Sequence, residues 1–329
     1  MSHLRTFSIA TTRSPGVSPI PRKRRPDLFD VIGRTPLLRL RSIAAHLPHV
    51  ELLAKAEHLN PGGSVKDRAA RAMLEDGLGR GLLRSGRTVL EATSGNTGIA
   101  LAMLARALGF EALICIPANA SPERCRTLAA LGAQLELTDP LAGTDGAILR
   151  ARELAVGEPE SYFYPDQYGN DANWRAHLTT TGPEIWTQTR GAVTHFVAGL
   201  GTSGTFVGTT RYLKARKPSL VAVSVEPDGP LHGLEGLKHM ASALVPRIYD
   251  PTLADQRLAM DTEEAYAMTR RLARHEGLFV GPSSGANVAS ALRVAESLPR
   301  DTRAVVVTVL PDGGGRYLGE RFWNEGAVS

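Results

Sequence analysis

The sequence predicts an α/β fold of two domains, each an open, mostly parallel twisted sheet with helices on both faces. Apolar strand candidates alternate with helix-like runs from about Asp27 onward, which is the pattern of parallel sheets covered on both faces. The chain has 329 residues, enough for two domains of ordinary size. Three strand–loop–helix junctions repeat a hydroxyl-hydroxyl-glycine step, and in such folds ligands bind beyond the carboxyl ends of the strands.

Short apolar strands and longer helix-like runs follow one another along the chain. We expect strands at residues 50–56, 88–92, 112–117, 134–138, 194–198, 220–226 and 304–309. We expect helices at residues 67–78, 97–108, 122–131, 144–155, 205–215, 262–275 and 286–298. Segment 159–173 is rich in turn formers and aromatic residues, so we expect it to join the two units.

The composition is that of an ordinary globular chain, with 43% hydrophobic and 22% charged residues. No apolar run approaches the roughly 20 residues that a membrane span needs, so we expect no membrane partner. The two cysteines, Cys115 and Cys125, offer neither a disulfide framework nor metal-ligand spacing. We therefore expect no bound metal and a reducing cytoplasm as the compartment.

The formal net charge of +5 arises from the first 26 residues. They contain no acid and six basic residues, so the rest of the chain is near −1; the basic residues are Arg5, Arg13, Arg22, Lys23, Arg24 and Arg25. A body without excess positive charge is not suited to bind nucleic acid. We expect residues 1–26 to be a disordered basic tail. The composition is also typical of a targeting peptide, although the prolines argue against an amphipathic helix.

Lys66 is the first candidate catalytic residue. It follows the turn Asn60-Pro61-Gly62-Gly63 at the end of an apolar strand and precedes the helix-like run 67–78. The positive end of a helix dipole and burial both lower the pKa of a lysine. A neutral amine so produced can form a Schiff base. A single lysine after a turn is more often a solvated surface residue, so this prediction depends on the rest of the chain.

Three loops share one design. Residues 92–98, 199–205 and 281–285 each follow an apolar segment, open a helix-like run and place two hydroxyl residues before a glycine. Glycines let the backbone approach a ligand closely, and free N–H groups at a helix start point at anions. Ordinary helix capping explains one such loop. Three of them indicate several anionic or polar groups held at one face of the molecule.

The second loop also fits a different function. Residues 199–204 match the pattern G-x-G-x-x-G, and Glu226 ends the next strand about 20 residues on, as in a dinucleotide fingerprint. Taken alone, this favours a nicotinamide-dependent dehydrogenase. However, the loop carries three hydroxyl groups, which suit a phosphate monoester better than a pyrophosphate. The dinucleotide interpretation also leaves Lys66 and the 92–98 loop without a role.

The set of motifs closely resembles the cysteine synthase and cystathionine β-synthase family of pyridoxal-phosphate enzymes, with cysteine synthase as the nearest type. The resemblance runs from about Asp27 to Trp323. The matching runs are IGRTPL (32–37), NPGGSVKDR (60–68), TSGNTG (93–98), DQY (166–168), TGPEIW (181–186), GTSGT (201–205) and SSG (283–285). A departure is Gly313, which stands where the family more often has an arginine after the aspartate.

The resemblance implies a fold-type II, tryptophan synthase β-like architecture. It places a smaller α/β domain at residues 54–165 and a larger one at residues 27–53 and 166–329, with the cofactor phosphate site in the larger domain. The active site is expected between the two domains. The resemblance also implies a homodimer.

The resemblance further implies a role for individual residues. Lys66 is expected to form the Schiff base with pyridoxal 5'-phosphate and to remove the substrate Cα proton. Asn96 is expected to bind the cofactor ring hydroxyl, and Ser283 the pyridine nitrogen. The expected phosphate cradle is Gly201, Thr202, Ser203, Gly204 and Thr205. The groups expected to bind the substrate carboxylate are Thr93, Ser94, Thr97 and Gln167.

The implied reaction is a β-replacement that forms L-cysteine from O-acetyl-L-serine and sulfide through an aminoacrylate intermediate. Alternatives within the family are phosphoserine as donor, or homocysteine (a cystathionine β-synthase) or an amine as acceptor; the alternative outside it is the dehydrogenase. Asp228 aligns where the phosphoserine-using branch has an arginine, which favours O-acetylserine. We expect His177 and His58 to be structural and segment 227–240 to be a mobile loop through which substrate enters.

Overall fold

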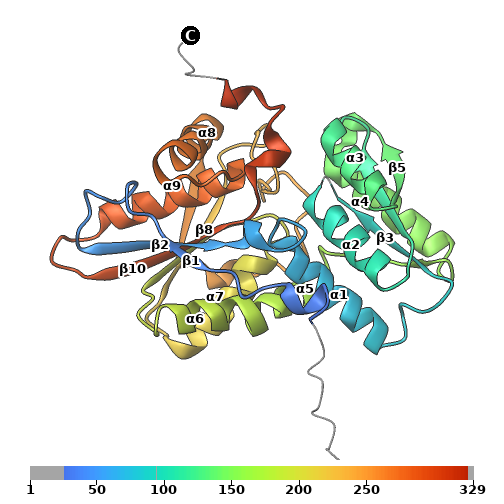
Figure 1. The fold of residues 1–329 in the computed structure, drawn as a ribbon, viewed down its shortest axis with the longest axis horizontal. Coiled ribbons are helices and arrows are strands. Elements are labelled where there is room, and N and C mark those ends of the chain that lie inside the picture. The colour runs from blue at the N-terminus through green and yellow to red at the C-terminus, as the bar shows by residue number, and fades with distance from the viewer. Residues whose placement is uncertain (1–25, 94, 325–329) are drawn as a thin grey trace, which may run out of the picture.

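The computed structural model describes residues 26–93 and 95–324. The predicted basic tail lies outside the described residues apart from Pro26, and so does Ser94. Figure 1 shows two parts side by side, each built on one sheet. The predicted fold class is confirmed, because both sheets are open and mostly parallel and carry helices.

The larger part contains a six-stranded sheet. Its strands are β1 (Leu37–Arg39), β2 (Val50–Ala56), β7 (His195–Gly199), β8 (Val221–Pro227), β9 (Gln256–Met260) and β10 (Ala304–Leu310). The spatial order is β1-β2-β10-β7-β8-β9. Only β1 pairs antiparallel with its neighbour; the other pairs are parallel.

The smaller part contains a four-stranded parallel sheet. Its strands are β3 (Thr88–Ala92), β4 (Ala112–Pro117), β5 (Gln134–Thr138) and β6 (Tyr162–Phe163). The order is β5-β4-β3-β6. The helices of the described chain are α1 (Lys66–Gly79), α2 (Asn96–Ala107), α3 (Pro122–Ala130), α4 (Gly143–Gly157), α5 (Asp171–Ala176), α6 (Gly182–Gln188), α7 (Gly204–Arg216), α8 (Thr262–Arg271) and α9 (Pro282–Ser297).

Helices cover both faces of the larger sheet, with α8 and α9 on one side and α6 and α7 on the other (Figure 1). Successive strand residues point to opposite faces of a sheet. Accordingly Val197 of β7 packs in the apolar cluster that includes α8 and α9. Its neighbour Phe196 packs in the cluster that includes α6 and α7. This two-sided burial is the reason why the strands are continuous apolar runs.

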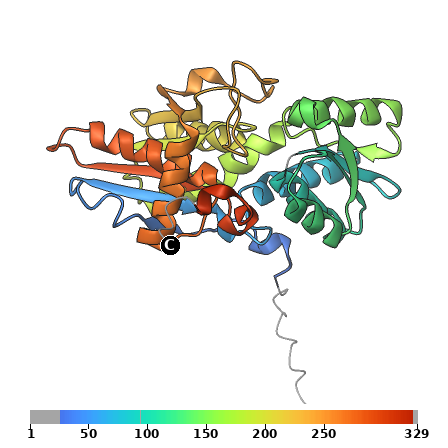
Figure 2. The ribbon, with the colours of Figure 1, turned by 90° about the horizontal axis from the view of Figure 1, so that it is seen from above.

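The same alternation builds the smaller part. Val89 of β3 packs with residues of α1, α2 and α3. Leu90, the next residue, packs with α4 on the other face. Figure 2, viewed from above, shows this part set to one side of the larger sheet. The loops that follow β3 and β7 line a common cleft, since Thr93 and Gly201 both border it.

The predicted strands agree with the observed ones to within one residue, but three strands were not predicted. These are β1 and β6, with three and two residues, and the edge strand β9. The predicted boundary between residues 53 and 54 falls inside β2, all of which pairs with β10 in the larger sheet. The division into domains otherwise stays a prediction. No helix in the described ranges is long and apolar enough to cross a membrane.

Candidate active site

A cleft of about 1030 Å³ lies between the two parts. The lining residues come from both parts: among those predicted to bind substrate or cofactor, they are Lys66, Thr93, Asn96, Thr97, Gln167, Gly201 and Thr202. Three predicted substrate residues, Thr93, Thr97 and Gln167, therefore meet in one cleft. The fourth, Ser94, lies outside the described residues.

A narrow pocket of about 50 Å³ adjoins the cleft. Its lining includes every residue predicted to bind the cofactor, namely Lys66, Asn96, Gly201, Thr202, Ser203, Gly204, Thr205 and Ser283. Lys66 and Asn96 line both spaces. The structure thus brings together residues that lie more than 200 positions apart in the sequence.

Lys66 is the first residue of α1, and the preceding turn holds it in place. The backbone N–H of Gly62 donates to the Asp67 carboxylate over 2.5 Å, and Gly63 takes a left-handed φ of +78°. Val65 N–H donates to the carbonyl of Pro311, at the end of β10, over 2.8 Å. The glycines are needed here because a side chain at Gly62 would collide with Asp67.

The Lys66 amine has a lowered proton affinity. Burial lowers the pKa of Lys66 to about 8, while the nearby Asp312 carboxylate acts in the opposite direction. Desolvation disfavours the charged ammonium form. A substantial fraction of neutral amine near neutral pH is what a nucleophile or a general base requires.

Asp312, the aspartate before Gly313, was given no role from the sequence, but it orients Asn96, a residue predicted to bind the cofactor. Its Oδ2 accepts hydrogen bonds from Asn96 Nδ2 and from the Tyr317 hydroxyl, each over 2.7 Å. Arg316 in turn donates to Asn96 Oδ1. The amide of Asn96 is therefore oriented from both ends. Asp312 follows Pro311 directly after the strand Ala304–Leu310, and this position at a strand end is the signal that could have identified it.

The loop before α7, residues 201–205, is the predicted anion cradle. Ser203 adopts a left-handed φ of +70°, and its buried hydroxyl has no hydrogen-bond partner among the described residues. A Cβ on Gly201 would lie 2.0 Å from the Gly236 carbonyl oxygen, and one on Gly204 would lie 2.1 Å from Asn173 Oδ1. The N-terminus of a helix and an unsatisfied hydroxyl together favour a phosphate group. The residues present thus fit a phosphate-bearing cofactor.

Ser283 lies in the first turn of α9 and is 4% exposed. It faces the narrow pocket together with Asn287, whose Nδ2 donates to the Val309 carbonyl over 2.9 Å. A neutral hydroxyl at this position can hydrogen-bond a ring nitrogen without enforcing its protonation. This differs from the strong electron sink that a carboxylate partner would produce.

The loop after β3 is the predicted carboxylate site. Thr93 Oγ1 accepts from the N–H of Gly95 over 3.0 Å. Beneath it lies Glu91, a buried carboxyl that was not predicted to belong to the site. Glu91 accepts from the N–H groups of Ala92 and Gln167 at 2.9 and 3.0 Å, yet burial raises its pKa to about 8. A glutamate inside an apolar strand gives no signal that one of its partners, Gln167, lies in another segment.

Two ion pairs join the parts across the cleft. Arg124 of α3 pairs with Glu235, and Lys238 donates to Asp145 of α4 over 2.8 Å. Glu235 and Lys238 both belong to segment 227–240, which was predicted to admit substrate, and both line the cleft. The mobility of this segment stays a prediction. Asp228, considered as a specificity residue, is exposed and does not line the cleft.

His177 lies behind the anion cradle in a π-helical turn between α5 and α6. Its Nδ1 is 2.9 Å from Thr181 Oγ1, and its Nε2 is 3.3 Å from Thr205 Oγ1. Burial, reinforced by the positive charge of Arg68, lowers the pKa of His177 to about 3. A neutral, hydrogen-bonded imidazole agrees with the structural role that was predicted.

Residues 28–312 match the sequence model of the family described as pyridoxal-phosphate dependent enzyme. The chain belongs to this family. The cofactor prediction is confirmed, and the alternative of a nicotinamide-dependent dehydrogenase is wrong. The hydroxyl groups and close packing of residues 201–205 suit a single phosphate, and their binding of the cofactor phosphate stays a prediction.

The cysteine synthase of Aquifex aeolicus (strain VF5) is 50% identical over 300 residues, covering 90% of this chain and 92% of that protein. A cysteine synthase structure from Entamoeba histolytica has a TM-score of 0.87 at 31% identity, covering 96% of each chain. An O-acetylserine dependent cystathionine β-synthase from Helicobacter pylori has a TM-score of 0.83 at 38% identity. The aligned region covers 89% of this chain and 97% of the Helicobacter pylori chain. The resemblance inferred from the motifs is confirmed.

Proposed function

We propose that this chain is a transferase that forms L-cysteine from O-acetyl-L-serine and sulfide by β-replacement, with pyridoxal phosphate as its cofactor. The observation that carries the proposal is the position of Lys66, which lines both the narrow pocket and the cleft. An amine there reaches both the cofactor and the substrate. The high identity to a named cysteine synthase over nine-tenths of the chain supports this choice.

The cofactor would be held at three points. The loop residues Gly201 to Thr205 and the N-terminus of α7 would bind the phosphate. Asn96 would bind the ring hydroxyl, and Ser283 the ring nitrogen. When bound, pyridoxal phosphate supplies an electrophilic carbon and a conjugated ring that accepts electron density as the Cα proton leaves.

The protein's own part is to bind, orient and move a proton. Thr93, Thr97 and Gln167 would fix the substrate carboxylate, which turns the Cα–H bond toward Lys66. Neutral Lys66 would take the Cα proton while acetate leaves the β-carbon. After sulfide adds to that carbon, Lys66 would return the proton to Cα. A positioned general base typically contributes about 10²–10⁴-fold in rate.

The choice of donor and acceptor is tested by an assay of purified, cofactor-loaded protein. O-acetyl-L-serine or O-phospho-L-serine is combined with sulfide, homocysteine or a small amine, and the amino-acid product is quantified. Fastest formation of L-cysteine from the acetyl ester and sulfide supports the proposal. Faster product formation with homocysteine would instead favour the activity named for the structurally similar Helicobacter pylori enzyme.

We also propose that the protein is a cytoplasmic homodimer. The resemblance to cysteine synthases supports the dimer, and the two free thiols, Cys115 and Cys125, are consistent with a reducing compartment. Light scattering coupled to size-exclusion chromatography tests the dimer. A mass near that of one chain would contradict it.

A further inference from the structure

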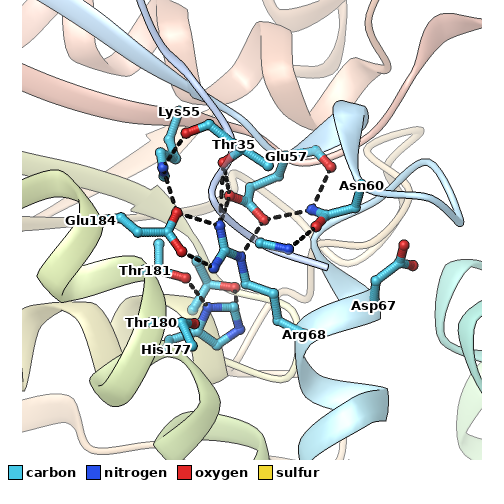
Figure 3. A network of polar contacts seen from close by, with 12 residues as sticks. Thr35, Lys55, Glu57, Asn60, Asp67, Arg68, His177, Thr180, Thr181 and Glu184 are labelled. Carbon is cyan, nitrogen blue, oxygen red and sulfur yellow. Dashed lines mark hydrogen bonds and ion pairs between the residues drawn. The ribbon is translucent and has the colours of Figure 1, made fainter. Parts of the chain in front are cut away.

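Four ionised side chains form a buried ion cluster beside the active site: Lys55, Glu57, Arg68 and Glu184 (Figure 3). Lys55 lies in β2, and Glu57 is the first residue after that strand. Arg68 lies in α1, and Glu184 in α6. The side chains of Lys55, Glu57 and Arg68 are at most 1% exposed, and that of Glu184 is 18% exposed. Two cations face two anions, so the cluster is electrically balanced.

Arg68 is held by two carboxylates at once. Its Nε and Nη2 donate to the two oxygens of Glu57 over 2.7 and 2.8 Å. Its Nη1 and Nη2 donate to the two oxygens of Glu184 over 2.7 and 2.8 Å. Each pair is bidentate, which fixes the orientation of the guanidinium plane as well as its distance. Burial alone would raise the pKa of Glu184, but Arg68 and Lys55 hold it at about 2.

The two carboxylates belong to the larger part. Glu57 continues from β2, a strand of the six-stranded sheet. Glu184 lies in α6, where the next residue, Ile185, packs with Phe196 of β7 and Phe206 of α7. The same α7 begins at the anion cradle. Arg68 therefore ties the start of α1 to the scaffold that carries the predicted phosphate site.

Arg68 lies two residues after Lys66, within the first turn of α1. The remainder of α1 packs with the smaller part through Ala70 and Leu74. Apolar packing restrains a helix without fixing its rotation and translation as closely as four directed hydrogen bonds do. Buried ion pairs contribute little net stability compared with apolar residues of similar volume. What this cluster contributes is a defined position for the first turn.

We propose that Arg68 is a positioning residue for Lys66, which sets the location of the amine relative to the cofactor phosphate site by clamping α1 between Glu57 and Glu184. The proposal rests on the assignment of Lys66 in the proposed function. Lys55 shares Glu184 with Arg68, over 2.7 Å, but lies on a strand that does not carry Lys66. It therefore provides a matched control at the same carboxylate.

The test compares Arg68→Met with Lys55→Met, since each removes one buried cation from Glu184. Three quantities are measured: the thermal midpoint, the rate at which cofactor-free protein takes up pyridoxal phosphate, and kcat and KM for the serine ester. We expect both variants to melt at lower temperature. Arg68→Met should lower cofactor uptake and kcat on the order of 10²-fold, as misplacement by about 1 Å does. KM should change less than roughly threefold, because the carboxylate site is in another loop.

Lys55→Met should keep cofactor uptake and kcat near those of the unchanged protein. Arg68→Lys, which keeps the charge but not the planar fork, should recover part of the lost rate. Where Arg68→Met does not fold, Arg68→Lys and Glu57→Gln give the same comparison with Lys55→Met. Equal losses in the Lys55 and Arg68 variants would overturn the proposal, because they would show general destabilisation.

Cofactor uptake needs neither serine ester nor sulfide. If another donor or acceptor were the true substrate, the uptake comparison would still decide the role of Arg68. Conversely, normal cysteine formation by Arg68→Met would overturn the positioning role and leave the proposed function intact.

Discussion

Thr97 donates a 2.6 Å hydrogen bond to the side-chain oxygen of Gln167, so two side chains expected to bind the substrate carboxylate also bind each other. The amide nitrogen of Gln167 donates to the Ala92 carbonyl over 2.8 Å. The backbone of Gln167 is fixed in turn, since its N–H donates to buried Glu91. The predicted carboxylate site is thus organised by hydrogen bonds between two segments of the chain.

Replacing Thr97 with valine should weaken binding of the serine ester more than it slows turnover. The change keeps the shape of the side chain but removes the hydroxyl that orients Gln167. A hydrogen bond to a charged group contributes about 1.5–3 kcal/mol, so KM should rise about 10-fold to 100-fold. Steady-state kinetics measure this. Thr189→Val is the control, since Thr189 caps the C-terminal end of α6 outside the cleft and its buried hydroxyl donates to the Ile185 carbonyl; an equal rise in KM there would contradict the assignment.

Replacing Lys66 with alanine should abolish turnover and the visible absorbance of protein-bound cofactor. The variant lacks both the amine that forms the Schiff base and the proposed general base, whose loss alone costs about 10²–10⁴-fold. Lys214→Ala is the control, because Lys214 of α7 pairs with Asp255 and lines neither the cleft nor the narrow pocket. Retained turnover in the Lys66 variant would show that another residue carries the chemistry.

The rate at which cofactor-free protein takes up pyridoxal phosphate should rise with pH and level off above pH about 8. The neutral amine is the nucleophile, and the pKa of Lys66 is lowered to about 8. Below that value the neutral fraction grows about tenfold per pH unit. Asp312→Asn removes the charge that opposes this lowering, so it should move the midpoint to lower pH. Stopped-flow absorbance between pH 6 and 9.5 measures both, and a flat profile would contradict the assignment.

Replacing Gly201 with alanine should weaken cofactor binding by about 5-fold to 150-fold, because overpacking costs about 1–3 kcal/mol. The new Cβ would lie 2.0 Å from the Gly236 carbonyl, and a backbone atom cannot turn aside. Equilibrium titration of cofactor-free protein measures the effect. Gly229→Ala should bind normally, since a Cβ there meets no atom within 4 Å.

His177 should make the protein less stable in mild acid. Its pKa is about 3 in the folded protein and 6.5 in an unfolded chain. Above pH 6.5 both states are neutral and the full stability is present. As the pH falls from 6.5 toward 3, only the unfolded chain takes the proton, so the free energy of unfolding drops by about 1.4 kcal/mol per pH unit. Urea unfolding between pH 4 and 7 measures how steeply the free energy of unfolding depends on pH. In His177→Gln this dependence should be weaker by the contribution of one proton, about 1.4 kcal/mol per pH unit. An unchanged pH dependence would exclude His177 as its source.

The sequence predicted the interior strands well because burial on both faces makes them continuous apolar runs. It failed for β9 (Gln256–Met260), an edge strand whose first two residues are exposed and which therefore lacks an apolar pattern. It also missed β1 and β6, which are too short to show a period.

The site residues could be predicted because three loops repeat glycine and hydroxyl residues, which let the backbone approach a ligand closely and offer donors to it. The buried ion cluster could not be predicted in the same way. Lys55 stands in an apolar strand, and its partner Glu184 lies 129 positions further along the chain. A lysine in a strand ordinarily extends its amine to solvent. Only the three-dimensional structure shows that the amine of Lys55 is instead buried against Glu184 of α6.

The pairing of β2 with β10 joins Val50 to Ala304, near opposite ends of the chain. The four strands of the smaller sheet, by contrast, lie within residues 88–163. Ribosomal synthesis proceeds from the N-terminus, and domains fold as units once their residues have emerged. We therefore expect the smaller sheet to form first. At that stage β1 and β2 can pair with each other, but β10, which pairs with β2 in the finished larger sheet, has not been synthesised. The nascent chain is accordingly expected to acquire its cofactor late in translation.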